Sequence, residues 1–236
     1  MIGAVTRILF VPGFMQRADA WTPVAELLPA EVECDLLDHG EHTFEGRMAE
    51  IAVGGEGAVL CGYSLGGRLV LRAALRDSER YRAVVTIGAT AGLEQPVERS
   101  TRADADERLA AWIEAASIED VVGVWERQPL FADQPEPLVE AQRPGRLSHD
   151  PRALALLLRT AGQGALEPVW HDLERLAPPL IAIAGTRDEA YARAAQRMAD
   201  LAPRGRAALV EDAGHAPHLQ RPGEVAGLLR EHIALL

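Results

Sequence analysis

The sequence predicts an α/β fold with a mostly parallel central sheet, helices on both faces and a helical insertion that interrupts the sheet. Two patterns lead to this prediction. Short apolar runs alternate with helical patterns at both ends of the chain, and the alternation stops in the middle. Short apolar strands alternating with helices are typical of a parallel sheet that is covered on both sides. With 236 residues, 48% of them hydrophobic, the chain is long enough to bury the core of such a sheet.

Residues 1–95 are expected to form the first part of this α/β core. Four short apolar runs are interpreted as buried strands, at 7–11, 31–37, 58–61 and 83–87. The segments that separate or precede these runs carry apolar residues at helical spacing, at 21–28, 45–52 and 65–75. The first three strands are therefore each followed by a helix that can cover one face of the sheet.

Residues 96–176 are expected to form a helical cap insertion, because no strand pattern appears there and helical patterns dominate, at 107–116, 118–126 and 151–160. About 80 helical residues with few aromatic side chains would bury little core alone, so this segment is not predicted to fold independently. The alternation then resumes in the second part of the core, residues 177–236. Its predicted elements are strands at 180–184 and 206–210 and helices at 190–201 and 224–235.

The composition excludes several classes of function. Lys plus Arg is 24, all of it Arg, against 35 Asp plus Glu, and the net charge of −11 with no basic block argues against nucleic acid or an anionic membrane as a partner. There is no apolar run of membrane-spanning length and no secretion signal, so a cytoplasmic location is expected. Cys34 and Cys61 are too few for a disulfide framework, and no metal-ligand spacing occurs, so neither a metal nor a cofactor is predicted. A small molecule remains as the expected partner.

A nucleophile turn is predicted at Gly62-Tyr63-Ser64-Leu65-Gly66, which follows an apolar strand directly and opens a helix. This G-x-S-x-G pattern between a strand and a helix presents the serine hydroxyl at the carboxyl edge of the sheet. The turn is sharp, so small residues must flank the serine. The Leu65 N–H lies at the helix N-terminus, where it can stabilise an oxyanion.

A serine nucleophile needs a base, and the base needs a carboxylate that fixes its tautomer. In this type of fold the order along the chain is serine, acid, histidine. Asp188 follows the predicted strand 180–184, and His215 follows the predicted strand 206–210. Both therefore lie on loops at the same edge as Ser64, where an open α/β sheet places its ligand site. We predict a catalytic triad of Ser64, Asp188 and His215.

The second oxyanion donor is expected from the loop after the first strand, Pro12-Gly13-Phe14-Met15. Gly13 allows the backbone to approach the substrate closely, and the Phe14 N–H is the candidate donor.

Several stretches of the chain carry a family resemblance. Gly62 to Arg68 matches a nucleophile segment, Trp125 to Phe131 a Trp-x-x-Gln-Pro-x-Phe segment of the cap, and Ala213 to His215, with His218, a catalytic histidine loop. The cap also contributes similar positions, namely Gly92-Leu93, Arg99, Arg102, Asp106, Arg146, Leu154, Gly162-Gln163-Gly164 and Trp170. Over nearly its full length the chain resembles the α/β-hydrolase superfamily. Within it, the chain resembles the 2-succinyl-6-hydroxy-2,4-cyclohexadiene-1-carboxylate synthases of the menaquinone pathway.

The resemblance implies an elimination in which loss of an α-proton expels pyruvate from a polycarboxylated cyclohexene. It implies that the triad abstracts the proton and that the oxyanion hole holds the enolate. Three guanidiniums around one pocket would suit such an anion, because each can bind a carboxylate through two hydrogen bonds. The expected substrate-binding residues are Gly13, Tyr63, Arg68, Arg99, Arg102, Trp125 and Arg146.

The chain departs from the family pattern at three places. Pro12 stands where a histidine is usual, Glu94 where a glutamine is frequent, and Glu189-Ala190 where a basic residue usually follows the triad aspartate. A hydrolase of esters, lactones or C–C bonds, using Ser64 as a covalent nucleophile, is the alternative. A binding protein without activity is disfavoured, since it would not need three triad members in the required order.

Overall fold

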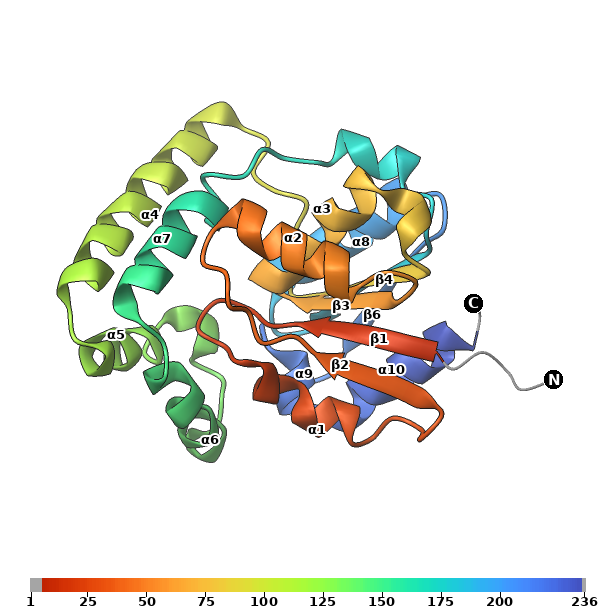
Figure 1. Ribbon diagram of the computed structural model, residues 1–236, viewed down its shortest axis with the longest axis horizontal. Coiled ribbons are helices and arrows are strands. Elements are labelled where there is room, and N and C mark those ends of the chain that lie inside the picture. Colours follow the sequence, from red (N-terminus) through yellow and green to blue (C-terminus); the bar gives the residue numbers. More distant parts are fainter. Residues whose placement is uncertain (1–5, 235–236) are drawn as a thin grey trace.

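The computed structural model describes residues 6–234 and confirms the predicted α/β fold (Figure 1). Six strands form one sheet in the order β2-β1-β3-β4-β5-β6, and every neighbouring pair is parallel. The strands are β1 (Thr6–Val11), β2 (Val32–Leu36), β3 (Val59–Tyr63), β4 (Ala83–Ile87), β5 (Leu180–Gly185) and β6 (Gly205–Val210). Since all six run in the same direction, the loops after their carboxyl ends meet at one edge.

The two faces of the sheet are covered by different helices, because successive strand side chains point in opposite directions. Leu9 and Val11 belong to one buried cluster, and Ile8 and Phe10 belong to the other. The first face is covered by α2 (Phe44–Gly54), α3 (Leu65–Arg76) and α8 (Glu189–Leu201). The opposite face is covered by α1 (Thr22–Ala25), α9 (Pro217–Gln220) and α10 (Pro222–Ile233).

Four helices lie between β4 and β5 in the chain, and Figure 1 shows them together beyond the carboxyl edge of the sheet. They are α4 (Pro96–Ala115), α5 (Ile118–Trp125), α6 (Glu136–Leu147) and α7 (Pro151–Ala161). We call residues 96–161 the helical segment. Helices α4 and α7 pack against each other and contribute Ala110, Ile113 and Leu154 to a third apolar cluster, which also holds Met15 from the loop after β1. The helical segment thus packs on a loop of the sheet edge.

Short 3₁₀ turns complete the connections, at η1 (Ala18–Trp21), η2 (Ser78–Arg80), η3 (Pro129–Phe131) and η4 (His171–Arg175). The predicted strands and most predicted helices agree with the structure within about two residues, whereas the helix predicted at 107–116 is the second half of the longer α4. Helices α6 and α9 were not predicted. The sequence of α6 contains Pro144 in the interior of the helix, where proline is unusual because it removes a backbone hydrogen bond. Residue 235, at the end of the last predicted helix, lies outside the described residues.

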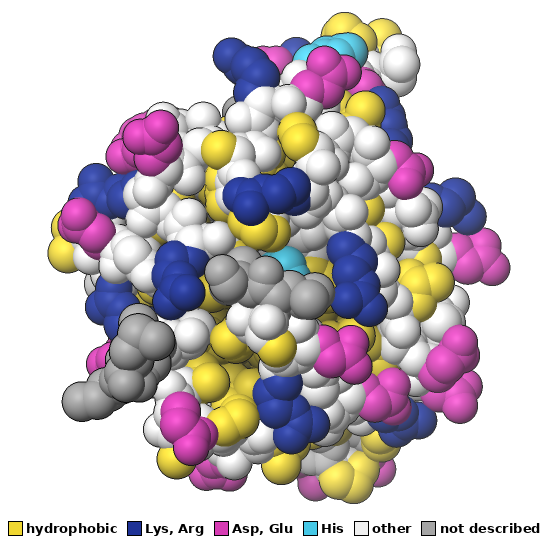
Figure 2. All heavy atoms as spheres, turned by 90° about the vertical axis from the view of Figure 1, so that its right-hand side faces the viewer, with side chains coloured by type: hydrophobic (Ala, Val, Ile, Leu, Met, Phe, Trp, Pro, Cys, Tyr) yellow, Lys and Arg dark blue, Asp and Glu magenta, His cyan; other side chains and the backbone are white. Residues whose placement is uncertain are grey.

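Acidic and basic side chains are interspersed on the face shown in Figure 2, which is the right-hand side of Figure 1. Many arginines across the described residues are paired with carboxylates, as are Arg76 with Glu45 and Arg80 with Glu56. Although the net charge is negative, many surface arginines thus lie next to a carboxylate. In residues 6–234, no helix is both long enough and apolar enough to span a membrane.

Candidate active site

Ser64 occupies a strained turn between β3 and α3. Its φ of 49° and ψ of −106° are unusual for a residue with a side chain, and its N–H donates to the Ile87 carbonyl at 2.8 Å. A Cβ atom on Gly62 would lie 2.4 Å from the backbone of Gly66, and one on Gly66 would lie 2.3 Å from the Val11 carbonyl. The pattern Gly-x-Ser-x-Gly is thus required by the close approach of the strand, the turn and the helix.

His215 lies between Ser64 and Asp188 in a continuous hydrogen-bonded chain. Its Nε2 is 3.2 Å from Ser64 Oγ, and its Nδ1 is 2.7 Å from Asp188 Oδ2. The ring is 3% exposed, so the histidine is shielded from competing water on most sides. The arrangement places the Nδ1 proton toward the carboxylate and leaves Nε2 able to accept a proton from the serine hydroxyl. The structure therefore brings the three predicted triad residues together.

The predicted oxyanion donors lie on two neighbouring loops. Leu65 is the first residue of α3, so its N–H has no partner within the helix. Among residues 6–234, neither this N–H nor that of Phe14 donates a hydrogen bond. The Phe14 loop is tight, since Met15 has a φ of 61° and the Gln16 N–H donates to the Gly13 carbonyl at 3.3 Å. Both N–H groups are thus available to a ligand.

A pocket opens from Ser64 and His215 into the space below the helical segment. Its wall beside the triad is aromatic: the centre of the Trp125 ring lies 5.1 Å from the ring centre of Phe14 and 5.6 Å from that of Phe131. The polar lining residues are Tyr63, Ser64, Arg68, Arg102, Gln128, Gln163, Tyr191 and His215. The apolar lining residues include Phe14, Leu65, Leu109, Trp125, Leu130, Phe131, Leu157 and Leu158. Such a pocket suits a small molecule with several polar groups on an apolar frame.

Two of the predicted arginines line this pocket. Arg68 Nη1 donates to the Ala161 carbonyl at 3.2 Å, and no carboxylate of residues 6–234 lies within ion-pair distance of the guanidinium. Burial lowers the pKa of Arg68 to about 10, so the group is still charged at neutral pH. Arg102 is held by Asp106 at 2.7 Å and by Gln163 at 3.2 Å, and nearly half of its side chain is exposed. Arg68 is therefore a partly buried cation with no ion-pair partner among residues 6–234.

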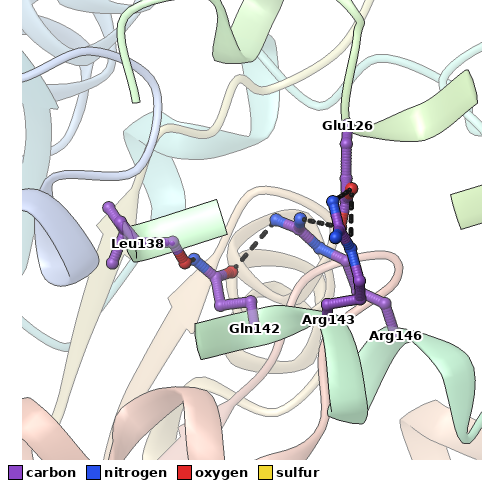
Figure 3. Close-up of polar contacts among 5 residues, drawn as sticks. All are labelled: Glu126, Leu138, Gln142, Arg143 and Arg146. Carbon is purple, nitrogen blue, oxygen red and sulfur yellow. Dashed lines mark hydrogen bonds and ion pairs between the residues drawn. The ribbon is translucent and has the colours of Figure 1, made fainter. Parts of the chain in front are cut away.

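The structure does not bring Arg99 or Arg146 to the pocket. Arg99 pairs with Glu167 at 3.1 Å. Arg146 is 4% exposed and donates to Glu126 at 3.0 Å and to Gln142 at 3.2 Å (Figure 3). Both guanidiniums are paired with carboxylates within the protein, although Arg146 Nε is buried without a hydrogen-bond partner in the described part of the chain, and this placement differs from the one that the sequence predicted.

Figure 3 also shows Arg143 on the same carboxylate as Arg146. The shortest contact of Arg143 to Glu126 is 2.5 Å, and the Glu126 side chain is 7% exposed. Burial tends to raise the pKa of Glu126, but hydrogen bonds from both arginines outweigh it and lower this pKa. Glu126 immediately follows Trp125, so this ion pair connects α6 with the chain segment that walls the pocket.

Three polar lining residues were not predicted as site residues. Gln128 and Gln163 lie in the stretches of the cap that carry the family resemblance. That resemblance is the sequence feature from which both could have been predicted. Tyr191 gave no signal beyond its place three residues after Asp188. Its ring packs edge-on against His215, with the ring centres 4.5 Å apart, and its hydroxyl is 3.5 Å from Gln163 Nε2. The phenol thus faces the pocket from α8.

The acidic residues at two of the departures from the family pattern are paired with arginines. Glu94 accepts hydrogen bonds from Arg197 at 2.5 and 2.9 Å, and Glu189 accepts one from Arg193 at 3.3 Å. Neither carboxylate lines the pocket. Within the described part of the chain, no group of three or more His, Cys, Asp or Glu side chains could hold a metal ion.

Comparison with known proteins places these residues in context. The family model "Alpha/beta hydrolase family" matches residues 8–228. A protein of Bacillus subtilis (strain 168), named as a candidate 2-succinyl-6-hydroxy-2,4-cyclohexadiene-1-carboxylate synthase, is 30% identical, covering 91% of this chain and 85% of its own. The synthase of that name from Citrobacter koseri is 26% identical and covers 97% of this chain and 94% of its own. Among solved structures, MenH from S. aureus has a TM-score of 0.89 at 24% identity and covers 98% of this chain and 94% of its own.

Proposed function

Since the chain belongs to the α/β-hydrolase family, we propose that it is a synthase that eliminates pyruvate from a polycarboxylated cyclohexene, as the names of its relatives suggest. The observation that carries this proposal is Arg68. Its guanidinium lies in the same pocket as Ser64 without a carboxylate partner among residues 6–234. A pocket for a neutral ester would leave this partly buried charge without an ion-pair partner, whereas a substrate carboxylate would pair with it.

The proposed reaction begins with the proton next to a carbonyl group of the substrate. Ser64 Oγ, hydrogen-bonded to His215 Nε2, takes this proton and passes its own to the imidazole. Asp188 stabilises the imidazolium through Nδ1. The electron pair of the broken C–H bond moves into the ring, and the C–O bond to the leaving group breaks. The leaving group departs as the enolate of pyruvate and takes up the proton held on His215, which gives pyruvate and restores the neutral imidazole. No covalent serine intermediate is required.

The proposed oxyanion site holds the charge that develops on the carbonyl oxygen. The N–H groups of Phe14 and Leu65 are both free among the described residues and flank Ser64. Donors that are fixed in place before the reaction stabilise an enolate as effectively as a tetrahedral intermediate, because both place negative charge on the same oxygen. The rings of Trp125 and Phe131 make this side of the pocket apolar.

The test compares two reactions of the purified protein. Pyruvate release from the cyclohexene precursor is followed with lactate dehydrogenase and NADH, and hydrolysis of p-nitrophenyl acetate is followed by absorbance. We expect pyruvate release that Ser64→Ala removes, together with very slow ester hydrolysis.

The opposite result would assign the chain to the hydrolases. Rapid ester turnover that depends on Ser64, with no pyruvate release and with an acyl group trapped on the serine, would contradict the proposed elimination. A mass increase of the intact protein reports the trapped acyl group directly.

A further inference from the structure

Two glutamine side chains hold the backbone of the two loops that complete the site. Gln16 Oε1 accepts a hydrogen bond from the Gly13 N–H at 3.1 Å, one residue before the proposed donor Phe14. Gln220 Oε1 accepts one from the Gly214 N–H at 2.7 Å, one residue before His215. Each carboxamide therefore fixes the peptide unit that immediately precedes a group of the active site.

The Gln16 carboxamide is held in turn by His218. Because its Oε1 faces the Gly13 N–H, its Nε2 donates to His218 Nε2 at 3.3 Å. The imidazole must then be an acceptor at Nε2, so its proton is on Nδ1. Complete burial lowers the pKa of His218 to about 3, which keeps the ring neutral as this acceptor role requires.

His218 has little freedom to move. It is 0% exposed and its ring packs between Trp21, at 4.6 Å, and Tyr63, at 4.2 Å between ring centres. Tyr63 directly precedes Ser64. The ring that holds Gln16 is therefore packed against the turn that carries Ser64.

Gln220 connects the histidine loop to the helical segment. Its Nε2 donates to Asp133 Oδ2 at 3.1 Å, and Asp133 follows the pocket residue Phe131 by two positions. A Cβ atom on Gly214 would lie 2.1 Å from the Asp133 carboxylate. The loop before His215 therefore approaches this carboxylate as closely as a glycine permits. His218 and Gln220 belong to the same short helix, α9.

We propose that α9 is a positioning element, and that Gln16 and Gln220 are positioning residues that fix the Phe14 N–H and His215 relative to Ser64. This inference rests on the proposed role of Phe14 as an oxyanion donor. The strained backbone at Met15, with φ of 61°, gives the loop a reason to be held, since an unheld loop would relax and turn the neighbouring N–H away. Neither glutamine lines the substrate pocket.

The test uses Gln16→Met, which keeps the length of the side chain and removes both hydrogen bonds. We expect kcat to fall about 10-fold with KM changed less than about 2-fold, a smaller loss than the 10²–10³-fold that follows deletion of an oxyanion donor. Phenylboronic acid is the second probe. Its boron binds Ser64 Oγ, the serine proton passes to His215, and the negative tetrahedral boronate places an oxygen in the oxyanion site. Its inhibition constant should rise by the same factor.

The matched control is Gln196→Met, since Gln196 is exposed on α8 and bonds only to Asp200. This variant should keep the wild-type kcat and boronate affinity. Thermal unfolding of both variants shows whether Gln16→Met still folds. A fully folded Gln16→Met protein with wild-type kcat and boronate affinity would overturn the proposal, as would a rise in KM at constant kcat. Because boronate binding requires no cyclohexene substrate, it tests the inference even if pyruvate release is never observed.

A spectroscopic measurement covers the case in which Gln16→Met does not fold. In the wild-type protein, ¹⁵N NMR of the histidine rings should show His218 as the neutral Nδ1–H form, with a Nε2 shift typical of a hydrogen-bond acceptor. Gln220→Met should leave this His218 signal unchanged and lower kcat, because it releases the His215 loop instead. A His218 ring that carries its proton on Nε2 would contradict the arrangement that the proposal requires.

Discussion

The loops at the carboxyl edge of the sheet and the helical segment contribute to one pocket, but they position their side chains in different ways. Ser64, Asp188 and His215 follow β3, β5 and β6 of the same parallel sheet, so the register of the sheet brings them together. Arg102 and Arg146 lie on helices whose orientation depends on packing and ion pairs. The Arg102 side chain lines the pocket, whereas the Arg146 side chain bonds to Glu126 outside it. Backbone pairing thus positions the three residues at the sheet edge, and side-chain contacts position the helical segment that lines the pocket.

The comparison predicts the largest loss at the sheet edge. Asp188→Asn should lower kcat by roughly 10³-fold or more, because an amide cannot hold the imidazole of His215 in its reactive tautomer. The thermal unfolding midpoint should stay near that of the wild type, which distinguishes lost chemistry from lost structure. Retention of more than a tenth of the wild-type kcat would show that the triad geometry does not carry the reaction.

In the helical segment we expect a substitution to lower the stability of the fold more than the rate of the reaction. Glu126→Gln removes the carboxylate between Arg143 and Arg146 and leaves the latter buried without a charge partner. Breaking a buried pair in this way costs about 3 kcal/mol of unfolding free energy, or about 10 °C in Tm for a chain of this size.

The matched control for this variant is Glu107→Gln, which breaks the exposed pair with Arg159 on the same segment. Solvent screens an exposed pair, so it contributes little to stability and the Tm of this variant should change much less. Equal losses of Tm in the two variants would show that burial of the Glu126 pair has no special weight.

A third prediction compares Arg68, which lines the pocket, with Arg146, which lies outside it. Arg68→Met should lower kcat/KM for the anionic substrate about 30-fold, since one charge-assisted contact is worth about 2 kcal/mol. Arg146→Met should act mainly on Tm, because its guanidinium bonds to Glu126 and Gln142. Steady-state kinetics and thermal unfolding of both variants give the answer, and a larger kinetic loss in Arg146→Met would reverse the assignment.

The smallest effect concerns a histidine between α6 and α7. Burial, with Arg17, Arg47 and His42 nearby, lowers the pKa of His149 from 6.5 to about 4, and Asp38 partly opposes this shift. Between these two pKa values the unfolded chain binds a proton that the folded chain does not, so stability falls as the pH falls through 6.5 toward 4. His149→Gln should therefore reduce the loss of unfolding free energy between pH 7.5 and 5.5 by about 1 kcal/mol.

The control for the pH measurement is His171→Gln, at an exposed position of η4. Denaturant unfolding at the two pH values should give the same difference for this variant as for the wild type. An unchanged pH dependence in His149→Gln would mean that other groups account for the acid sensitivity.

The same contrast explains how much could be predicted from the sequence. The strands, the turn at Ser64 and the loops of Asp188 and His215 follow from apolar runs and turn residues, which are local patterns. The partner of Arg146 is Glu126, twenty residues away and just after the end of α5, and no local pattern selects it among the many carboxylates of the chain. Tyr191 escaped prediction for a related reason, since only the packing of α8 turns its ring toward His215.

Met15 ties the two regions together in a way that bears on how the protein unfolds. Its side chain is 2% exposed and belongs to the apolar cluster of α4, α5 and α7, although its backbone is part of the loop that carries Phe14. Opening of the helical segment would expose this side chain and release the loop. Hydrogen exchange should therefore report one cooperative unit that contains both the helices and the loop that carries Phe14. A motion large enough to uncover the pocket would displace the proposed oxyanion donor at the same time.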